Sequence, residues 1–183
     1  MKTITIGYFI SNAIIVTALL TVWQRYRQLY AGLSLWLTYS VLETAGMLLT
    51  AQRDIAPAAL SIVAAQLCTV GGALVLLIGL ERFASLLGPR FPNYLLIAGF
   101  LGAMIYFTYL KPDIQIRTFV IFASPALLAG QSAWLMLNRA PERLGPVIRP
   151  AGFVFLAFLA VHVYRIILTA VLPPPENLFQ IQE

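Results

Sequence analysis

Six long apolar stretches constrain the fold of this chain more than any other feature. They cover residues 4–23, 31–51, 58–80, 93–110, 118–137 and 152–172 of the 183-residue sequence. A helix that crosses a bilayer needs about 20 mainly apolar residues, and each stretch approaches or exceeds that length. Because backbone groups must pair with one another in lipid, each stretch is expected to be helical. The sequence predicts an all-α, polytopic membrane helix bundle with six transmembrane helices, which forms one unit over residues 1–172.

Composition excludes two broad classes of protein. Hydrophobic residues make up 60% of the chain and charged residues 10%, a balance that a water-soluble domain of this length could not cover with polar surface. The net charge of +5 comes from Lys and Arg residues scattered singly through the connections between the stretches. Since they form no basic face, we expect lipid and not nucleic acid as the partner of this surface, and we assign the excess to membrane orientation.

The distribution of positive charge predicts which side of the membrane each connection occupies. With the N-terminus outside, the cytoplasmic connections hold Arg25, Arg27, Arg82, Arg90, Arg139, Arg143 and Arg149, and the outer ones hold Lys2, Arg53, Lys111 and Arg117. Seven against four agrees with the retention of basic loops in the cytoplasm. The sixth span then runs outward, and the polar, Pro-rich tail at 173–183 lies outside. We expect a multi-pass protein of the bacterial inner membrane.

Residues that carry chemistry are few. The chain has one cysteine, Cys68, one histidine, His162, and no lysine within a predicted span. A retinal Schiff base, a bis-histidine haem and a His-based catalytic triad therefore lack their residues, and no Walker, dinucleotide-binding, CxxC or HExxH motif is present. We expect no catalysis, no cofactor and no metal site in this chain.

Small residues recur at four-residue spacing, which lets helices approach closely. They are Ala64, Cys68 and Gly72 in the third stretch, and Ala98 and Gly102 in the fourth. Packing inside the bundle is the expected role of both sets, and a homodimer seam is the alternative.

Strongly ionisable side chains deep within the stretches are Glu43, His162 and Arg165. At 1.5 Å per residue, Glu43 lies about 18 Å along its helix, His162 about 15 Å and Arg165 about 20 Å along theirs, so their depths match. A charge at mid-bilayer costs about 2.5 to 3.5 kcal/mol and needs a partner. We predict a Glu43–Arg165 ion pair with His162 and Tyr39 as hydrogen-bonding neighbours. Whether the cluster locks two helices or switches between states stays open.

Several short motifs resemble a known family. They are GLSLW at 32–36, Gln52 with Arg53, APAALSIV at 56–63, GLERF at 79–83 and FTYLKPDIQIRTFVIF at 107–122, followed by Arg165. Together they resemble the N-terminal membrane region found ahead of GGDEF domains in bacterial diguanylate cyclases. Such regions are multi-helix sensors that signal through a last helix to a cytoplasmic domain that makes cyclic di-GMP. This sequence departs from the pattern in lacking that last helix and any GGDEF motif.

Two functions follow as hypotheses. The first is a membrane-embedded sensory or input module, without its own catalysis, that modulates a cytoplasmic output domain in cis or in trans, such as a diguanylate cyclase. The second is a small transporter or channel subunit that uses the Glu43, His162 and Arg165 cluster as a polar path. A scaffold without a ligand is a third reading.

Overall fold

The computed structural model describes residues 2–28, 32–52, 55–85, 88, 90–139, 141 and 145–172, and of residues 2–6, 8, 9 and 147 it describes the backbone alone. The predicted positions Arg53 and Arg143 and the predicted tail at 173–183 lie outside these residues. The chain divides into two compact units, Met1–Gly88 and Pro89–Glu183. The structure does not fix how the two units sit relative to one another, so the single bundle over 1–172 stays a prediction.

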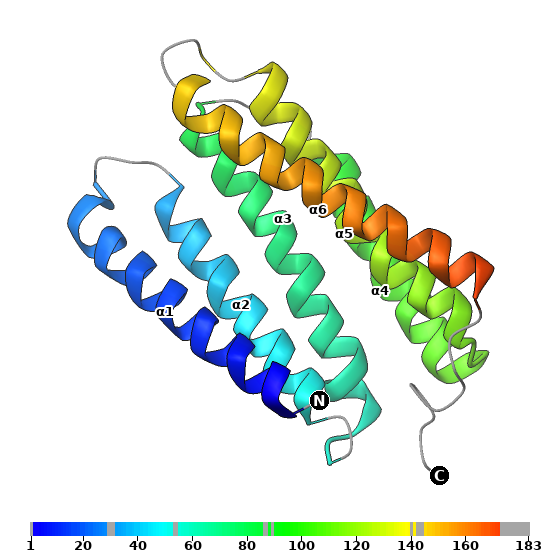
Figure 1. Cartoon of the computed structure of the whole chain (residues 1–183). Coiled ribbons are helices and arrows are strands. Elements are labelled where there is room, and N and C mark those ends of the chain that lie inside the picture. Colours follow the sequence, from blue (N-terminus) through cyan, green and yellow to red (C-terminus); the bar gives the residue numbers. More distant parts are fainter. Residues whose placement is uncertain are drawn as a thin grey trace. The chain divides into compact units, whose positions relative to one another are not determined.

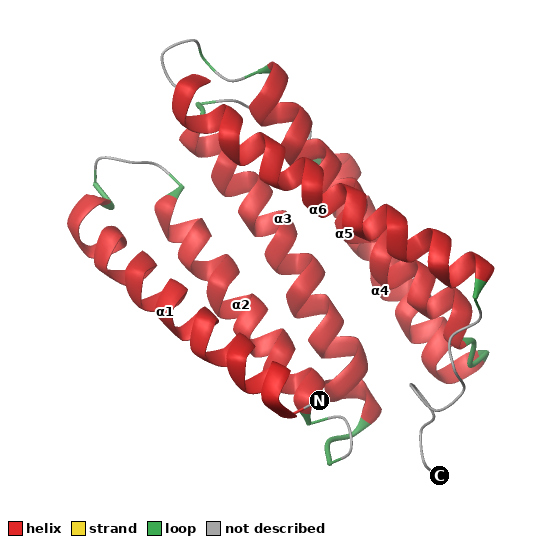
Figure 2. Ribbon diagram, in the orientation of Figure 1, coloured by secondary structure: helices red, strands yellow, loops and turns green. Residues whose placement is uncertain are grey.

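All regular structure in the described residues is helical (Figure 2). The elements are α1 (Lys2–Tyr26), α2 (Leu33–Ala51), the π-helical segment η1 (Ala59–Ala64), α3 (Ala65–Phe83), α4 (Phe91–Ile105), the π-helical segment η2 (Tyr106–Leu110), α5 (Ile114–Asn138) and α6 (Gly145–Val171). Because η1 continues into α3 and η2 continues from α4, the six predicted apolar stretches correspond to six continuous helices. The all-α prediction is confirmed.

In the N-terminal unit α2 lies between α1 and α3, and its contact with α3 is the more extensive (Figure 1). Glycines bring α2 and α3 together. A Cβ at Gly46 would lie 2.9 Å from the Ala65 carbonyl oxygen, and one at Gly72 would lie 3.4 Å from Tyr39 Cδ2. The two contacts are seven residues apart on each helix, at Tyr39 and Gly46 of α2 and at Ala65 and Gly72 of α3. The two backbones therefore stay close along this contact, which we call the α2–α3 seam.

This seam shows what the small residues do. Gly72 and Cys68 both lie against α2, which agrees with the expected packing role of the third stretch. The fourth stretch differs, because a Cβ at Gly102 would meet no atom of the described residues within 4 Å. The packing role of Ala98 and Gly102 in the fourth stretch therefore stays a prediction.

In the C-terminal unit α5 contacts both α4 and α6, and the α5–α6 contact is the more extensive. Most of the less exposed positions of α6 alternate at spacings of three and four residues: Gly145, Ile148, Gly152, Phe155, Leu159, His162, Ile166 and Thr169. This is the periodicity of a helix with one packed face. Asp113 caps α5 by accepting a 3.0 Å hydrogen bond from the Ile116 N–H, and Pro92 lies in the first turn of α4, where proline is favoured.

Within the part of the chain that the structure describes, four helical segments are long and apolar enough to cross a membrane: Ala59–Phe83, Phe91–Leu110, Ile114–Asn138 and Ile148–Val171. The last is apolar on its exposed side as well, with Phe153, Val154, Leu156, Phe158, Val161 and Ile167 outside the packed face. A helix that is hydrophobic all round is typical of a buried or membrane-spanning segment. The remaining two helices, α1 and α2, carry the polar residues that form the site described next.

Candidate functional site

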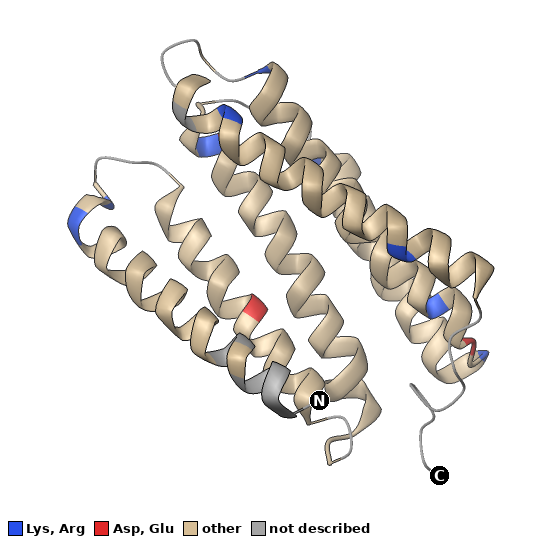
Figure 3. Ribbon diagram, in the orientation of Figure 1, with Lys and Arg blue, Asp and Glu red and all other residues tan. Residues whose placement is uncertain are grey.

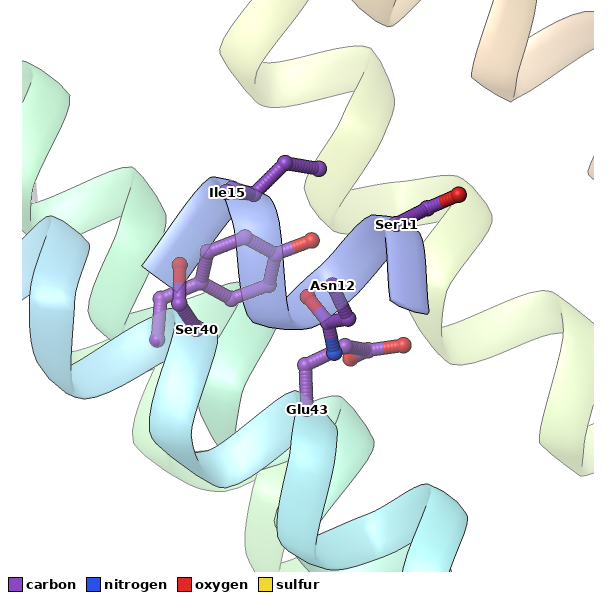
Figure 4. A pocket seen from close by; sticks show the side chains of 6 residues that line it. Ser11, Asn12, Ile15, Ser40 and Glu43 are labelled. Atoms are coloured by element: carbon purple, nitrogen blue, oxygen red, sulfur yellow. The ribbon is translucent and has the colours of Figure 1, made fainter. Parts of the chain in front are cut away.

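A pocket whose lining includes several polar side chains lies between α1 and α2 in the N-terminal unit (Figure 4). Its volume is about 160 Å³. The lining residues are Ser11, Asn12 and Ile15 of α1 and Tyr39, Ser40 and Glu43 of α2. Five of the six have a polar side chain, although both helices are otherwise mainly apolar. A concave site with a few convergent polar groups is the usual form of a small-ligand site.

Glu43 is the charged member of the pocket. It lies near the middle of α2 and is half-buried. In Figure 3 the acidic colour on α2 lies well away from both ends of the helix. Tyr39 is one turn earlier on the same helix, so both side chains reach the same pocket. A carboxylate in the middle of an apolar helix is costly and is retained mainly where it has a function.

Asn12 is held in a fixed orientation by its neighbour on α2. Its Nδ2 donates a 2.8 Å hydrogen bond to Thr44 Oγ1, and Thr44 Oγ1 donates a 2.7 Å bond to the Ser40 carbonyl. A threonine hydroxyl has one proton, which Thr44 gives to Ser40, so Thr44 can only accept from Asn12. The amide nitrogen of Asn12 must therefore face Thr44.

A second hydrogen bond joins α1 to α2 at the other end of their contact. Trp23 Nε1 donates to Ser34 Oγ over 2.9 Å. Polar bonds between membrane helices contribute about 0.6 to 2 kcal/mol each. Among the described side chains, two hydrogen bonds thus join α1 to α2, whereas the α2–α3 contact depends on close backbone packing.

His162 and Arg165 lie on α6 in the C-terminal unit, against Phe122 of α5. The Arg165 guanidinium carbon is 5.3 Å from the Phe122 ring centroid, and the His162 ring is edge-on to the same ring at 6.3 Å. His162 Nδ1 is 2.8 Å from the Phe158 carbonyl oxygen. Since a carbonyl oxygen only accepts, Nδ1 carries a proton and Nε2 is the acceptor of the neutral ring.

The structure brings together two pairs of the predicted site residues. Tyr39 and Glu43 share the pocket, and His162 and Arg165 flank Phe122. The two pairs belong to different units, so the Glu43–Arg165 ion pair stays a prediction.

Sequence reasoning missed the other polar residues of the pocket, Ser11, Asn12 and Ser40, together with Thr44 behind it. A usable signal was present, because Ser11 and Asn12 are adjacent within an otherwise apolar stretch. Asparagine within a membrane helix commonly hydrogen-bonds to a neighbouring helix.

Within the described ranges, no three His, Cys, Asp or Glu side chains lie close enough together to hold a metal ion. No protein-family model, no curated protein and no solved structure matches the chain.

Proposed function

We propose that this chain is a membrane-embedded sensory module that has no catalysis of its own and modulates a cytoplasmic output domain, in cis or in trans, such as a diguanylate cyclase. The observation that carries the proposal is the pocket with Glu43 between α1 and α2. A charged group inside apolar helices is by default a functional-site hypothesis. The pocket lies at the less extensive of the two contacts that α2 makes, so a ligand there acts where the helices are least firmly held.

The proposed topology has six crossings of the bacterial inner membrane. Beyond the four apolar segments already described, α1 has 25 residues and α2 has 19, and 19 residues at 1.5 Å each extend about 28 Å, close to the thickness of the hydrocarbon core. The exposed face of α1 carries Ile10, Ile14 and Ile15, which suit a lipid environment. Its buried Asn12 is paired with Thr44.

Charge within each unit supports an N-terminus outside. In the N-terminal unit, Arg25 and Arg82 lie in the last turns of α1 and α3, which are at the same end because neighbouring helices are antiparallel. In the C-terminal unit, Arg90 precedes α4, Arg139 follows α5 and Arg149 is early in α6. Both units thus place their basic end at the connection between them, and a cytoplasmic position for that end satisfies the positive-inside rule.

Aromatic residues accompany the basic ends. The Arg27 guanidinium carbon is 4.9 Å from the Trp23 ring centroid, and that of Arg139 is 4.7 Å from the Trp134 ring centroid. Tryptophan and arginine are typical of the membrane interface. These two pairs therefore support a membrane interface at the basic end of each unit.

Cysteine labelling tests the orientation. In a Cys68→Ala background, Lys111→Cys is expected to react with a membrane-impermeant maleimide in intact cells, and Arg139→Cys is expected to react only after the cells are opened. The two positions flank α5 at opposite ends, so each serves as the control of the other. The reverse pattern would contradict the proposed orientation.

The sensory role is tested in cells with a cyclic di-GMP reporter. The wild-type chain is expected to change the reporter signal at least about twofold relative to empty vector, and Glu43→Gln is expected to abolish the change, because the amide keeps the shape of the side chain but removes the charge that the pocket presents. Thr38→Ala is the matched control. Thr38 is exposed on the same helix, outside the pocket, and its hydroxyl bonds to the Ser34 carbonyl of its own helix.

A transporter or channel subunit is the second candidate, and the division into two three-helix units favours it. In each unit the middle helix packs against both others, and two units with three crossings each would have opposite orientations in the membrane, as in inverted-repeat transporters. An unchanged cyclic di-GMP signal, together with solute uptake into proteoliposomes that Glu43→Gln abolishes, would contradict the sensory proposal and support transport.

A further inference from the structure

We propose that the C-terminal end of α6, where it packs on α5, binds the phosphate group of an anionic lipid through the guanidinium of Arg165. The proposal assigns a site in the C-terminal unit and does not depend on the pocket between α1 and α2. Three observations lead to it: the contacts of the guanidinium, the depth of Arg165 along its span and the bulky apolar side chains around it.

The guanidinium of Arg165 is held against an aromatic ring. Arg165 is exposed on α6, and its guanidinium carbon lies 5.3 Å from the Phe122 ring centroid. Within the described part of the chain the guanidinium makes this contact and no hydrogen bond or ion pair. The ring attracts the cation but offers no oxygen acceptor to its N–H groups. Phe122 therefore positions a set of donors that suits the paired hydrogen bonds of a phosphate.

Arg165 lies near one end of an apolar span. The segment Ile148–Val171 has 24 residues, which extend about 36 Å, whereas the hydrocarbon core of a bilayer is about 30 Å thick. Arg165 lies about 9 Å along the axis from Val171, so in a centred span its backbone is about 6 Å inside the edge of the core. An arginine at such a depth extends its side chain to the head groups, and local thinning of the bilayer shortens the distance. Lipid phosphates are the anions that this depth brings within reach.

The side chains around Arg165 suit the acyl chains of a lipid. On α6, Phe158 and Val161 lie on the same side of the helix as Arg165 and are 53% and 50% exposed. On α5, Phe119 lies one turn from Phe122 and is 46% exposed. Contacts between membrane helices favour small residues, whereas these side chains are bulky. The surface beside Arg165 therefore favours a lipid over a further helix.

A second polar side chain lies one turn nearer to the end of α6. The Gln115 Nε2 of α5 donates a 3.2 Å hydrogen bond to the Thr169 carbonyl oxygen, and Thr169 Oγ1 donates a 2.9 Å bond to the Arg165 carbonyl oxygen. A glutamine amide has a second N–H donor, and Gln115 is exposed. This donor suits a phosphate oxygen or a glycerol hydroxyl of the same head group.

The charge at this end of the unit favours an anionic lipid. Among the described residues of the C-terminal unit, Asp113 is the only acidic one, and its carboxylate caps α5. Lys111, just before α5, is exposed and adds a second positive charge. The phosphate of phosphatidylcholine is already balanced by the ammonium group of the same lipid, whereas that of phosphatidylglycerol leaves a net negative charge for a basic residue to attract.

The test identifies the lipid beside Arg165 by photo-crosslinking. The purified full chain with Phe119→p-benzoylphenylalanine is placed in nanodiscs that contain equal amounts of phosphatidylcholine and phosphatidylglycerol, and mass spectrometry identifies the attached lipid. We expect phosphatidylglycerol to exceed phosphatidylcholine about fivefold, as for one basic residue near an anionic membrane surface. Tyr164→p-benzoylphenylalanine is the matched control. Tyr164 is 61% exposed, at nearly the depth of Arg165 but about 100° away around the helix, so its attached lipids should reflect the bulk mixture.

Variants identify the binding group. With the probe at position 119, Arg165→Gln is expected to abolish the preference for phosphatidylglycerol, because it removes the charge. Arg165→Lys is expected to keep part of the preference, since it retains the charge but loses the paired donors of the guanidinium. Arg149→Gln removes an equal charge from an exposed position near the other end of α6, and it should leave the preference at position 119 unchanged.

Equal attachment of the two lipids at position 119, with Arg165 in place, would overturn the proposal whether or not the Arg165 variants fold. A preference that persists in Arg165→Gln would also overturn it, and so would attachment to a second protein chain in place of lipid. Loss of the preference on addition of inorganic phosphate, but not of sodium chloride at equal ionic strength, would assign the site to a soluble anion instead. A preference that appears only in Glu43→Gln would return Arg165 to the predicted ion pair with Glu43.

Discussion

Replacement of Gly32 by alanine is expected to destabilise the N-terminal unit by about 2 to 6 kcal/mol, the sum of about 1 to 3 kcal/mol of backbone strain and about 1 to 3 kcal/mol of overpacking. Gly32 has a φ of 102°, a conformation that residues with a Cβ rarely adopt. A Cβ there would also overlap the Gly79 carbonyl oxygen and lie 3.4 Å from the Phe83 nitrogen. Both neighbours are backbone atoms of α3, so relief requires the helices to move apart.

The measurement is the free energy of unfolding of the purified chain in SDS titrations, followed by far-UV circular dichroism. Gly99→Ala in α4 is a suitable control, because a Cβ at that helical position would meet no atom of the described residues within 4 Å. Unfolding free energies for Gly32→Ala within about 0.5 kcal/mol of the wild type, the usual range for neutral surface changes, would show that the α2–α3 approach is looser than the structure has it.

Hydropathy alone identified the six continuous helices, because each is a long apolar run bounded by charged or proline residues. It could not distinguish α-helix from π-helix at Ala59–Ala64 and Tyr106–Leu110. The same side chains suit either form, and the difference lies in which carbonyl each N–H reaches. Nor could it show that the chain divides into two compact units at Gly88, since that depends on which helices touch.

Only part of the candidate site could be predicted, because residue spacing describes one helix at a time and not the contacts between helices. Residue spacing along one helix predicted shared faces for Tyr39 with Glu43 and for His162 with Arg165, and in the structure the first pair lines one pocket and the second lies beside one ring. The partner of each pair on another helix depends on rotation about the helix axis, which matched depth does not specify. Depth suggested Arg165 for Glu43, whereas the residues beside Glu43 in the pocket include Asn12 of α1. Asn12 escaped notice because it is uncharged and its stretch remains apolar overall.

The two faces of α2 differ in a way that suits a sensor. Its contact with α3 is fixed by glycines, including Gly72 and Gly79, that leave no room for adjustment. Its contact with α1 includes the Asn12–Thr44 and Trp23–Ser34 hydrogen bonds and a pocket. Because the α2–α3 contact is rigid, a movement of α1 changes its position relative to a fixed pair of helices. The proposed sensing therefore depends on the rigidity of the α2–α3 contact.

Gly79→Ala tests that seam directly, and we expect it to lower the free energy of unfolding by about 1 to 3 kcal/mol, as overpacking does. A Cβ at Gly79 would lie 2.6 Å from Trp36 Cδ1 and 2.9 Å from its Nε1. The Trp36 ring is itself packed against Phe83, with centroids 5.2 Å apart, so it cannot turn aside freely. Gly71→Ala is the matched control on the same helix, because a Cβ there would meet no described atom within 4 Å. That control should gain up to about 1 kcal/mol from the higher helix propensity of alanine.

A double-mutant cycle with Trp36→Leu separates the overlap from a general loss of stability. Removal of the indole frees the space that the new methyl group needs, so Gly79→Ala should cost less in the Trp36→Leu background than in the wild type, by at least about 0.5 kcal/mol. Part of the cost should remain, because Leu35 Cβ would still lie 3.2 Å from the added Cβ. If the effects of the two substitutions on the free energy of unfolding were strictly additive, the indole would not be what limits the space beside Gly79. The α2–α3 pair would then lack the rigidity against which α1 is proposed to move.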